Sequence, residues 1–204
     1  MTDFALSTFE GPLVVPELRS GPVLLRPFDP SDLDLIRHAA SDPYIPTITS
    51  VPRVYSDDAA RAFVARQHSR SDGGHGYPFV IADPADPGSG LGALGLWLRE
   101  IEEGRASVGY WMAPSARGRR LAGWALRGVA SFAFDVLAIP RLHLFVEPWN
   151  IASQRTAEFA GFTQEAFLRG WERIDQMQHD VYCYSILRQE WSPPGASESP
   201  HVAP

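Results

Sequence analysis

The spacing of apolar and polar residues predicts short strands and amphipathic helices in mixed order. Apolar residues recur every three or four positions between Leu121 and Leu137, as in a helix with one buried face. Short apolar runs bounded by turn residues, such as residues 91–98, instead predict strands. The strands are expected at residues 23–28, 74–83, 91–98, 105–112, 141–148, 163–174 and 178–191. The helices are expected at residues 32–41, 56–70, 121–137 and 150–162.

Residues at the helix ends support these boundaries. Ser56 precedes two acidic residues and is a suitable N-cap, and Gly161 is a suitable C-cap for the helix before it. Asp29 or Ser31 could cap the helix at residues 32–41. The chain order is one strand, two helices, three strands, a helix, a strand, a helix and two strands. This order predicts a single mixed α/β domain.

The two ends of the chain differ in composition from its centre. Residues 1–20 contain prolines and a glycine and are expected to form an irregular N-terminal arm. Residues 192–204 are polar and proline-rich, which is typical of a disordered tail. Residues 21–191 hold no internal repeat and no linker, so they are expected to form one domain.

Composition and charge narrow the classes of partner. The formal net charge of -6 argues against a protein that binds nucleic acid through general electrostatics. Cys183 is the only cysteine, and of the scattered histidines only His179 lies near a suspected site, so no metal is expected. No apolar run approaches the roughly 20 residues that span a bilayer, and the N-terminus lacks the features of a signal peptide. We therefore expect a cytoplasmic protein that binds neither nucleic acid nor membrane.

A basic cluster stands out against this acidic background. Arg117, Arg119 and Arg120 directly precede the predicted helix at residues 121–137. The unpaired N–H groups and the dipole at a helix start favour an anion, and arginine adds charge-assisted contacts to phosphate. Gly118 allows the backbone to approach closely. The cluster predicts either a phosphate or pyrophosphate cradle or a solvated helix start with surface arginines. It matches neither the P-loop nor the G-x-G-x-x-G dinucleotide pattern.

Residues 108–134, VGYWMAPSARGRRLAGWALRGVASFAF, resemble the acyl-CoA-binding segment of the GNAT acetyltransferase superfamily. The resemblance is to the RimJ/RimL-like branch, which modifies ribosomal-protein N-termini. The family pattern R/Q-x-x-G-x-G/A is matched by Arg117, Gly118, Arg119, Arg120, Leu121 and Ala122. Arg120 stands where the pattern has its first glycine, and a non-glycine residue is disfavoured at positive φ. A negative φ at Arg120 would still leave its N–H group available.

A second segment carries the same resemblance. The branch's pattern N-x-x-S-x-x-x-x-E-x-x-G-F is matched by Asn150, Ser153, Glu158, Gly161 and Phe162. The two motifs occur in the family's order, and the similarity covers residues 91–191. It implies a mixed α/β, GNAT-like fold whose twisted, mostly antiparallel sheet has about six to seven strands and is flanked by about four helices.

The resemblance implies direct transfer of an acetyl group, or another acyl group, from acetyl-CoA or a related thioester to a primary amine. Residues 117–122 would hold the CoA pyrophosphate through backbone N–H groups. The backbone of Trp111 and Met112 would contact the thioester arm. Asn150 would contact the CoA arm, and Ser153 would lie near the sulfur as a hydrogen-bond donor or acid.

Each catalytic role has a structural alternative. Glu172 lies where this branch often has a glutamate that acts as base, but it could be an exposed strand carboxylate. Asn150 and Ser153 could simply cap the helix that follows. Many family members protonate the sulfur with a tyrosine on that helix; here it has none, so the role falls to Ser153 or to solvent. Glu147 could line the acceptor site, although a solvated carboxylate is the simpler interpretation.

The sequence leaves the acceptor open. The helices before residue 70 and the loop at residues 41–56 are expected to shape one wall of its site. A protein N-terminus and a small amine metabolite or antibiotic are both compatible; an open groove favours the first and a closed apolar pocket the second. The alternative to an enzyme is a non-catalytic acyl-CoA-binding sensor or partner domain, and a nucleotide-binding regulator is a weaker third. A homodimer is a further expectation, and Trp124 could meet a partner chain, the N-terminal arm or the CoA adenine.

Overall fold

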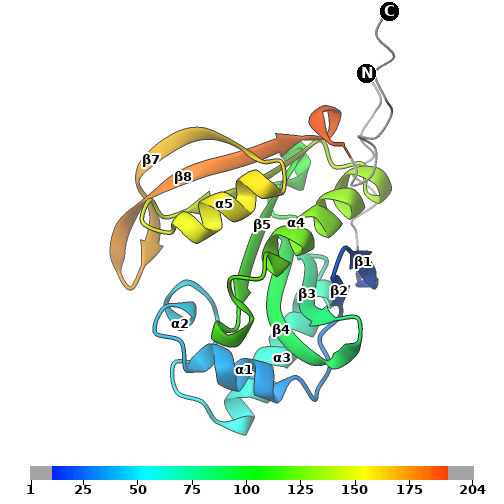
Figure 1. Ribbon diagram of the computed structural model, residues 1–204, viewed down its shortest axis with the longest axis vertical. Helices are drawn as coiled ribbons and strands as arrows, with labels where there is room; N and C mark the ends of the chain where they lie inside the picture. The colour runs from blue at the N-terminus through cyan, green and yellow to red at the C-terminus, as the bar shows by residue number, and fades with distance from the viewer. Residues whose placement is uncertain (1–10, 193–204) are drawn as a thin grey trace, which may run out of the picture.

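The computed structural model of the chain describes residues 11–192. An eight-stranded sheet in the order β1-β2-β3-β4-β5-β6-β8-β7 forms its centre (Figure 1). The strands are β1 Leu18–Ser20, β2 Val23–Arg26, β3 Gly76–Asp83, β4 Asp86–Trp97, β5 Arg105–Met112, β6 Arg141–Val146, β7 Thr163–Ile174 and β8 Met177–Leu187. The α-helices are α1 Leu33–Ala40, α2 Ile45–Ile48, α3 Asp57–Asp72, α4 Leu121–Ser131 and α5 Ile151–Phe159. The predictions for residues 1–10 and 193–204 lie outside the described residues.

The sheet has eight strands rather than six to seven, because the predicted irregular arm contributes one of them. β1 pairs antiparallel with β2, and Gly21 in the turn between them has a φ of 51°. A strand of three residues is too short to produce a recognisable periodic pattern. The described helices number five instead of four, because α2 forms within the segment expected to be a loop.

The helix-end signals in the sequence were informative for α3 and α5. Ser56 caps α3 by accepting a hydrogen bond from the N–H of Ala59 at 3.1 Å, as predicted. Gly161 follows α5 in the left-handed conformation, with a φ of 92°. The helix predicted at residues 121–137 consists of α4 followed by one π-helical turn, Phe132–Val136.

The expected caps of α1, Asp29 and Ser31, do not cap it. The N-cap position is Asp32, and its carboxylate turns away from the helix. It accepts hydrogen bonds from the guanidinium of Arg26 at 2.7 and 2.8 Å, and both side chains are buried. This ion pair fastens the start of α1 to the end of β2.

Helices cover both faces of the sheet. α4 packs on strands β1 to β5 and lies next to α5 (Figure 1). α1 and α3 pack on the opposite face, against β4 and β3. Along β5, Val108 belongs to the core beneath α4, whereas Trp111 belongs to the core beneath α1 and α3. The two faces of β5 therefore contribute to two separate hydrophobic clusters.

Candidate active site

β5 and β6 are neighbouring strands that separate along their length. They form the parallel pair of the described sheet, and their pairing covers three residue pairs and ends at Ser107↔His143. β5 continues to Met112 and β6 to Val146 without pairing further with each other. Because the strands are parallel, both carboxyl ends lie at the same side of the sheet. A gap therefore opens between the two strand ends.

The backbone of Met112, rather than that of Trp111, faces this gap. In an antiparallel ladder, successive residues direct their N–H and C=O groups to opposite sides. Ala113 donates its N–H to β4, and the carbonyl oxygen of Trp111 crowds Gly92 on β4. Met112 and, two residues earlier, Tyr110 therefore present their backbone groups to the gap. The expected contact of Trp111 and Met112 with the acyl arm stays a prediction, and this orientation favours Met112 for it.

The segment after β5 enters α4 through two left-handed residues. Gly118 has a φ of 76° and Arg120 a φ of 58°, so Arg120 adopts the glycine-like conformation rather than a negative φ. That conformation costs a non-glycine residue roughly 1 kcal/mol. Within the described chain, no backbone carbonyl accepts from the N–H groups of residues 118–123; the first to be bonded is that of Trp124. These free donors at the positive end of the helix dipole fit a pyrophosphate.

Arg117 uses its side chain within the protein. Its Nη2 donates to Oδ2 of Asp42 at 2.6 Å, and its Nε donates to the carbonyl oxygen of Met112 at 3.2 Å. Its guanidinium therefore links this segment to the turn before α2 and is already bonded within the protein. Arg119 and Arg120 are exposed and form no ion pair within residues 11–192. These two arginines are the ones available to an external anion.

Asp42 is kept ionised although it is buried. Burial on its own would raise the pKa of this carboxyl group, whose side chain is 5% exposed. The N–H groups of Ile45 and Tyr44, each 2.9 Å away, and the Arg117 guanidinium outweigh burial and lower the pKa of Asp42. The turn that starts at Asp42 is thus fixed to the β5 side of the gap.

The same turn reaches the β6 side of the gap through Tyr44. The Tyr44 hydroxyl donates to Oε2 of Glu147, the residue after β6, and Nδ1 of His179 lies 2.7 Å from Oε1. Burial and the Glu147 carboxylate raise the pKa of Tyr44, so its hydroxyl stays a neutral donor. Glu147 is 6% exposed, which makes the interpretation as a solvated carboxylate wrong. Residues 42–44 therefore span the mouth of the gap.

The start of α5 lies beside this gap. Oδ1 of Asn150 accepts a hydrogen bond from the N–H of Ser153 at 3.1 Å, so Asn150 does cap the helix. The hydroxyl of Tyr110 on β5 donates to the carbonyl oxygen of Ser153 at 3.3 Å. This bond joins β5 to α5 and keeps Ser153 next to the strand whose backbone faces the gap.

Glu172 lies on the hairpin formed by β7 and β8. It is exposed and is the register partner of His179, so the two side chains share one face of the sheet. The structure thus brings the predicted Glu172 close to a cluster of Tyr44, Glu147 and His179. The sequence drew attention to Glu147 and His179 only weakly, and nothing in it indicated that they pair.

Trp124 and Cys183 lie in surroundings that suit packing within the fold. The Trp124 ring packs edge-on against Phe159 of α5 with centroids 5.6 Å apart, and it covers Gly21 in the turn after β1. Gly21 directly follows the expected N-terminal arm of residues 1–20, so Trp124 lies close to the end of one of its expected neighbours. Burial raises the pKa of the half-buried Cys183 thiol, which does not suit a nucleophile.

Sequence and structure comparisons agree with this geometry. The acetyltransferase (GNAT) domain family matches residues 23–163. The chain belongs to this family. The uncharacterised N-acetyltransferase p20 of Bacillus licheniformis is 26% identical over 169 residues, which cover 82% of this chain and 94% of p20. YdaF of Bacillus subtilis (strain 168), provisionally named a ribosomal N-acetyltransferase, is 30% identical over 104 residues, or 51% of this chain and 57% of YdaF.

The fold is also shared with RimJ of Mycobacterium smegmatis, whose structure contains a CoA disulfide. The TM-score is 0.73 at 22% identity, over 86% of this chain and 88% of RimJ. These relatives are consistent with the RimJ/RimL-like branch that the motifs predicted. This GNAT chain is accordingly an N-acetyltransferase that takes its acetyl group from acetyl-CoA. Within residues 11–192, no His, Cys, Asp and Glu side chains gather in threes as metal ligands, and no helix is long and apolar enough to cross a membrane.

Proposed function

We propose that this acetyltransferase modifies the α-amino group of a protein or peptide N-terminus, with Ser153 at the thioester sulfur and Glu172 at the acceptor amine. The cluster of Tyr44, Glu147 and His179 at the mouth of the β5–β6 gap carries the proposal. It supplies an acidic, hydrogen-bonded end to the gap, on the side opposite the free N–H groups of α4. Such an end is suited to an incoming amine.

Acetyl-CoA would lie between the start of α4 and the gap. The N–H groups of residues 118–123 are suited to the pyrophosphate, with Arg119 and Arg120 adding charge. The backbone groups of Tyr110 and Met112 are suited to the amides of the pantetheine arm, which would add to β5 as a further strand does. The thioester would then reach the start of α5.

Two groups near that point suit the chemistry of acetyl transfer. The thioester oxygen gains negative charge during attack, and a backbone N–H that faces the gap, such as that of Met112, is placed to stabilise it. The sulfur leaves as a thiolate, and the Ser153 hydroxyl is a donor for it. Neither role needs the tyrosine that many family members carry on the corresponding helix.

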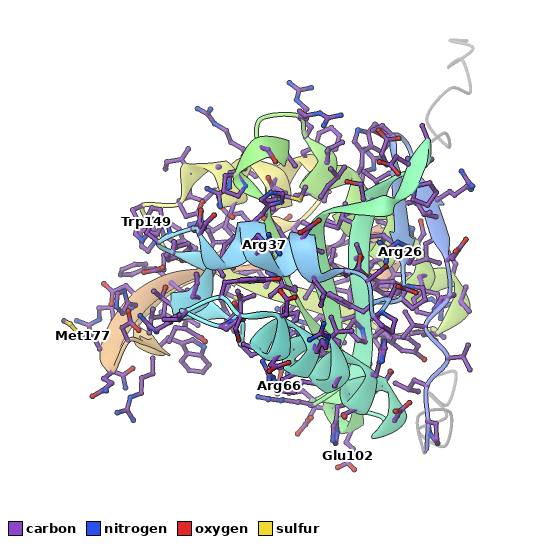
Figure 2. The ribbon with its side chains drawn as sticks, turned by 90° about the horizontal axis from the view of Figure 1, so that it is seen from below. Arg26, Arg37, Arg66, Glu102, Trp149 and Met177 are labelled. Carbon is purple, nitrogen blue, oxygen red and sulfur yellow. The ribbon has the colours of Figure 1, made fainter. Side chains whose placement is uncertain are left out.

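The surroundings of the acceptor end favour a peptide. Trp149 and Trp171 are 60% and 57% exposed, and Figure 2 shows Trp149 and Met177 at this end of the molecule. Two cavities of about 140 and 540 Å³ lie elsewhere, one beside Arg127 and the other beside β1. Exposed aromatic side chains offer contact area to an extended chain, whereas a small metabolite is usually enclosed.

A thiol-release assay tests the proposal. The purified protein is mixed with acetyl-CoA and either short peptides with free N-termini or small amines, and free CoA is measured. We expect release that depends on the peptides and falls at least tenfold in Ser153→Ala and in Glu172→Gln. Release only with small amines would replace the peptide by a metabolite as acceptor. Tight acetyl-CoA binding, unaffected by either substitution and without release in any mixture, would favour the sensor alternative.

A further inference from the structure

We propose that His179 is the general base of the transfer and that Glu147 and Tyr44 position its imidazole ring. The inference rests on the proposed function, because it assigns the proton acceptor within the same acceptor site. It gives this role to a histidine instead of to Glu172.

Glu147 determines which nitrogen of His179 is available. A carboxylate oxygen can only accept, so Nδ1 of His179, 2.7 Å from Oε1, carries a proton. Nε2 of the neutral ring then has a free lone pair, and it has no hydrogen-bond partner in the described part of the chain. The His179 side chain is 35% exposed, so its ring is open to solvent on one side of the site. A ring fixed in one tautomer with one open nitrogen is what a general base requires.

Tyr44 fixes the position of the Glu147 carboxylate, which in turn orients His179. Its hydroxyl occupies Oε2, so both oxygens of the buried Glu147 are bonded and the carboxylate cannot turn away. Tyr44 is itself fixed, because Asp42 two residues earlier is bonded to Arg117 and because Trp149 packs edge-on against the Tyr44 ring at 4.8 Å. A continuous set of contacts therefore runs from the segment after β5 to the histidine.

The chemistry also favours an imidazole over a carboxylate. As a class, imidazoles are stronger bases than carboxylates and are the side chains that most often accept a proton from a reacting group. Glu172, the neighbour of His179 across the β7–β8 ladder, then has the separate task of attracting the positively charged amine.

The proposed step balances without another reactant. The ammonium group first loses one proton to solvent; the lone pair of the resulting neutral amine then attacks the thioester carbon, and a C–N bond forms. The proton on the attacking nitrogen moves to Nε2 of His179, and the C–S bond breaks to release CoA as a thiolate. Water protonates the thiolate, and the imidazolium returns its proton to solvent. One amide and one free thiol are formed.

His179→Gln tests the role, because glutamine is polar and of similar size but is not a base. With a peptide acceptor, we expect kcat to fall about 100-fold or more, while the acetyl-CoA affinity changes less than about twofold. Added imidazole should restore part of the activity of His179→Ala. The matched control is His75→Gln, an exposed histidine just before β3 that the site does not use, and it should retain full activity.

The pH profile separates a base from a structural residue. The titratable groups that face His179 are Glu147 after β6, Glu172 on β7 and Tyr44 before α2; the Arg53–Asp175 ion pair lies at the hairpin turn. Activity of the wild type should decline at low pH, and this decline should be absent from His179→Gln. Glu147→Gln removes the neighbouring negative charge, so this decline should move to lower pH.

The outcomes also distinguish the inference from the proposed function. An active wild type with His179→Gln equally active and unchanged in pH profile would overturn the inference and leave the proposed function intact. In a third outcome, His179→Ala loses both its activity and its affinity for acetyl-CoA, and added imidazole restores neither. That result would mean that His179 has a structural role, and it would also overturn the inference. A wild type that acetylates no amine would overturn both.

Discussion

Arg117 donates to Asp42 at 2.6 Å and so joins two segments that lie 75 residues apart in the chain. Arg117 belongs to the motif that marks the CoA site, and Asp42 opens the turn that closes the mouth of the gap. The two halves of the candidate active site are therefore held together by one ion pair. A substitution at either residue should therefore disturb both the CoA-binding segment and the turn at the mouth of the gap.

Asp42→Asn should weaken the fold and make it less sensitive to acid. Loss of the carboxylate leaves Arg117 and two backbone N–H groups with a poorer acceptor, at a cost of about 1–3 kcal/mol in the free energy of unfolding. The pKa of Asp42 is lowered in the folded state. Its stabilising contribution is therefore present above the unfolded-state pKa of about 3.9 and is lost as the pH falls through the folded-state pKa.

Urea unfolding measured at several values between pH 7 and pH 3 tests this. The variant should lose stability at neutral pH and show a shallower decline on acidification than the wild type. Asp34→Asn is the matched control, because Asp34 is 83% exposed and its contact with Arg37 is at the surface. Equal pH dependence in wild type and Asp42→Asn would contradict the role assigned to this carboxylate.

The turn at the start of α4 should bind acetyl-CoA through its backbone more than through its arginines. Arg120→Gly keeps the left-handed conformation and removes one exposed charge, so the affinity should fall by no more than about fivefold. Gly118→Val forces a β-branched residue into a φ of 76°, and we expect a fall of more than about tenfold. No atom lies within 4 Å of the added Cβ at Gly118, so a loss reports backbone conformation rather than a clash.

Titration calorimetry with acetyl-CoA measures both affinities under one set of conditions. A larger loss in Arg120→Gly than in Gly118→Val would mean that side-chain charge, and not the row of N–H groups, holds the pyrophosphate.

The sequence predicted what is encoded locally. Ser56 and Gly161 marked the ends of α3 and α5 correctly, and the glycine and arginine spacing of residues 117–122 indicated a turn that the structure contains. Arg120 adopts a positive φ because the turn as a whole requires it, which a single-residue preference could not reveal. β1 was missed because a strand of three residues is too short to show an alternation of apolar and polar positions.

The contacts that complete the site are not local. Tyr44 and Glu147 are 103 residues apart, and Glu147 and His179 are 32 apart. The chain can bring them together only after β6, β8 and the turn before α2 have taken their places in the fold. Glu147 therefore looked like a solvated residue before a proline, and the pairing with His179 had no signal in the sequence.

Asn150 offers a way to separate helix capping from ligand binding. Asn150→Ala removes the bond to the N–H of Ser153 and should cost about 1 kcal/mol of stability. Asn150→Asp restores a capping oxygen and should recover most of that stability. If Asn150 also contacts the CoA arm, Asn150→Asp should still bind acetyl-CoA at least about fivefold more weakly. Recovery of both stability and affinity in Asn150→Asp would mean that Asn150 only caps the helix and does not contact the CoA arm.

Ser153→Ala should affect the reaction without affecting the fold. The bonds of Ser153 to Asn150 and to Tyr110 use its backbone N–H and carbonyl, so both survive the substitution. We expect the free energy of unfolding to change by less than about 0.5 kcal/mol and kcat to fall at least about tenfold. Denaturant unfolding and the thiol-release assay measure the two quantities on the same sample. An unchanged kcat would mean that solvent, and not Ser153, donates to the leaving sulfur.

Gly123→Ala should separate α4 from α5. A Cβ at residue 123 would lie 2.4 Å from Cδ1 of Phe159, so the Phe159 ring or one of the two helices has to move. The resulting strain, about 1–3 kcal/mol, exceeds the gain of roughly 1 kcal/mol from the better helix propensity of alanine. The starts of these helices carry the free N–H groups and Ser153, so KM for acetyl-CoA should also rise several-fold.

Gly88→Ala at the exposed start of β4 is the control, because the nearest atom to its Cβ is 3.9 Å away. It should leave the melting temperature and KM unchanged. If Gly123→Ala behaved in the same way, the close approach of α4 and α5 would not be what sets the distance between the pyrophosphate and thioester ends of the site.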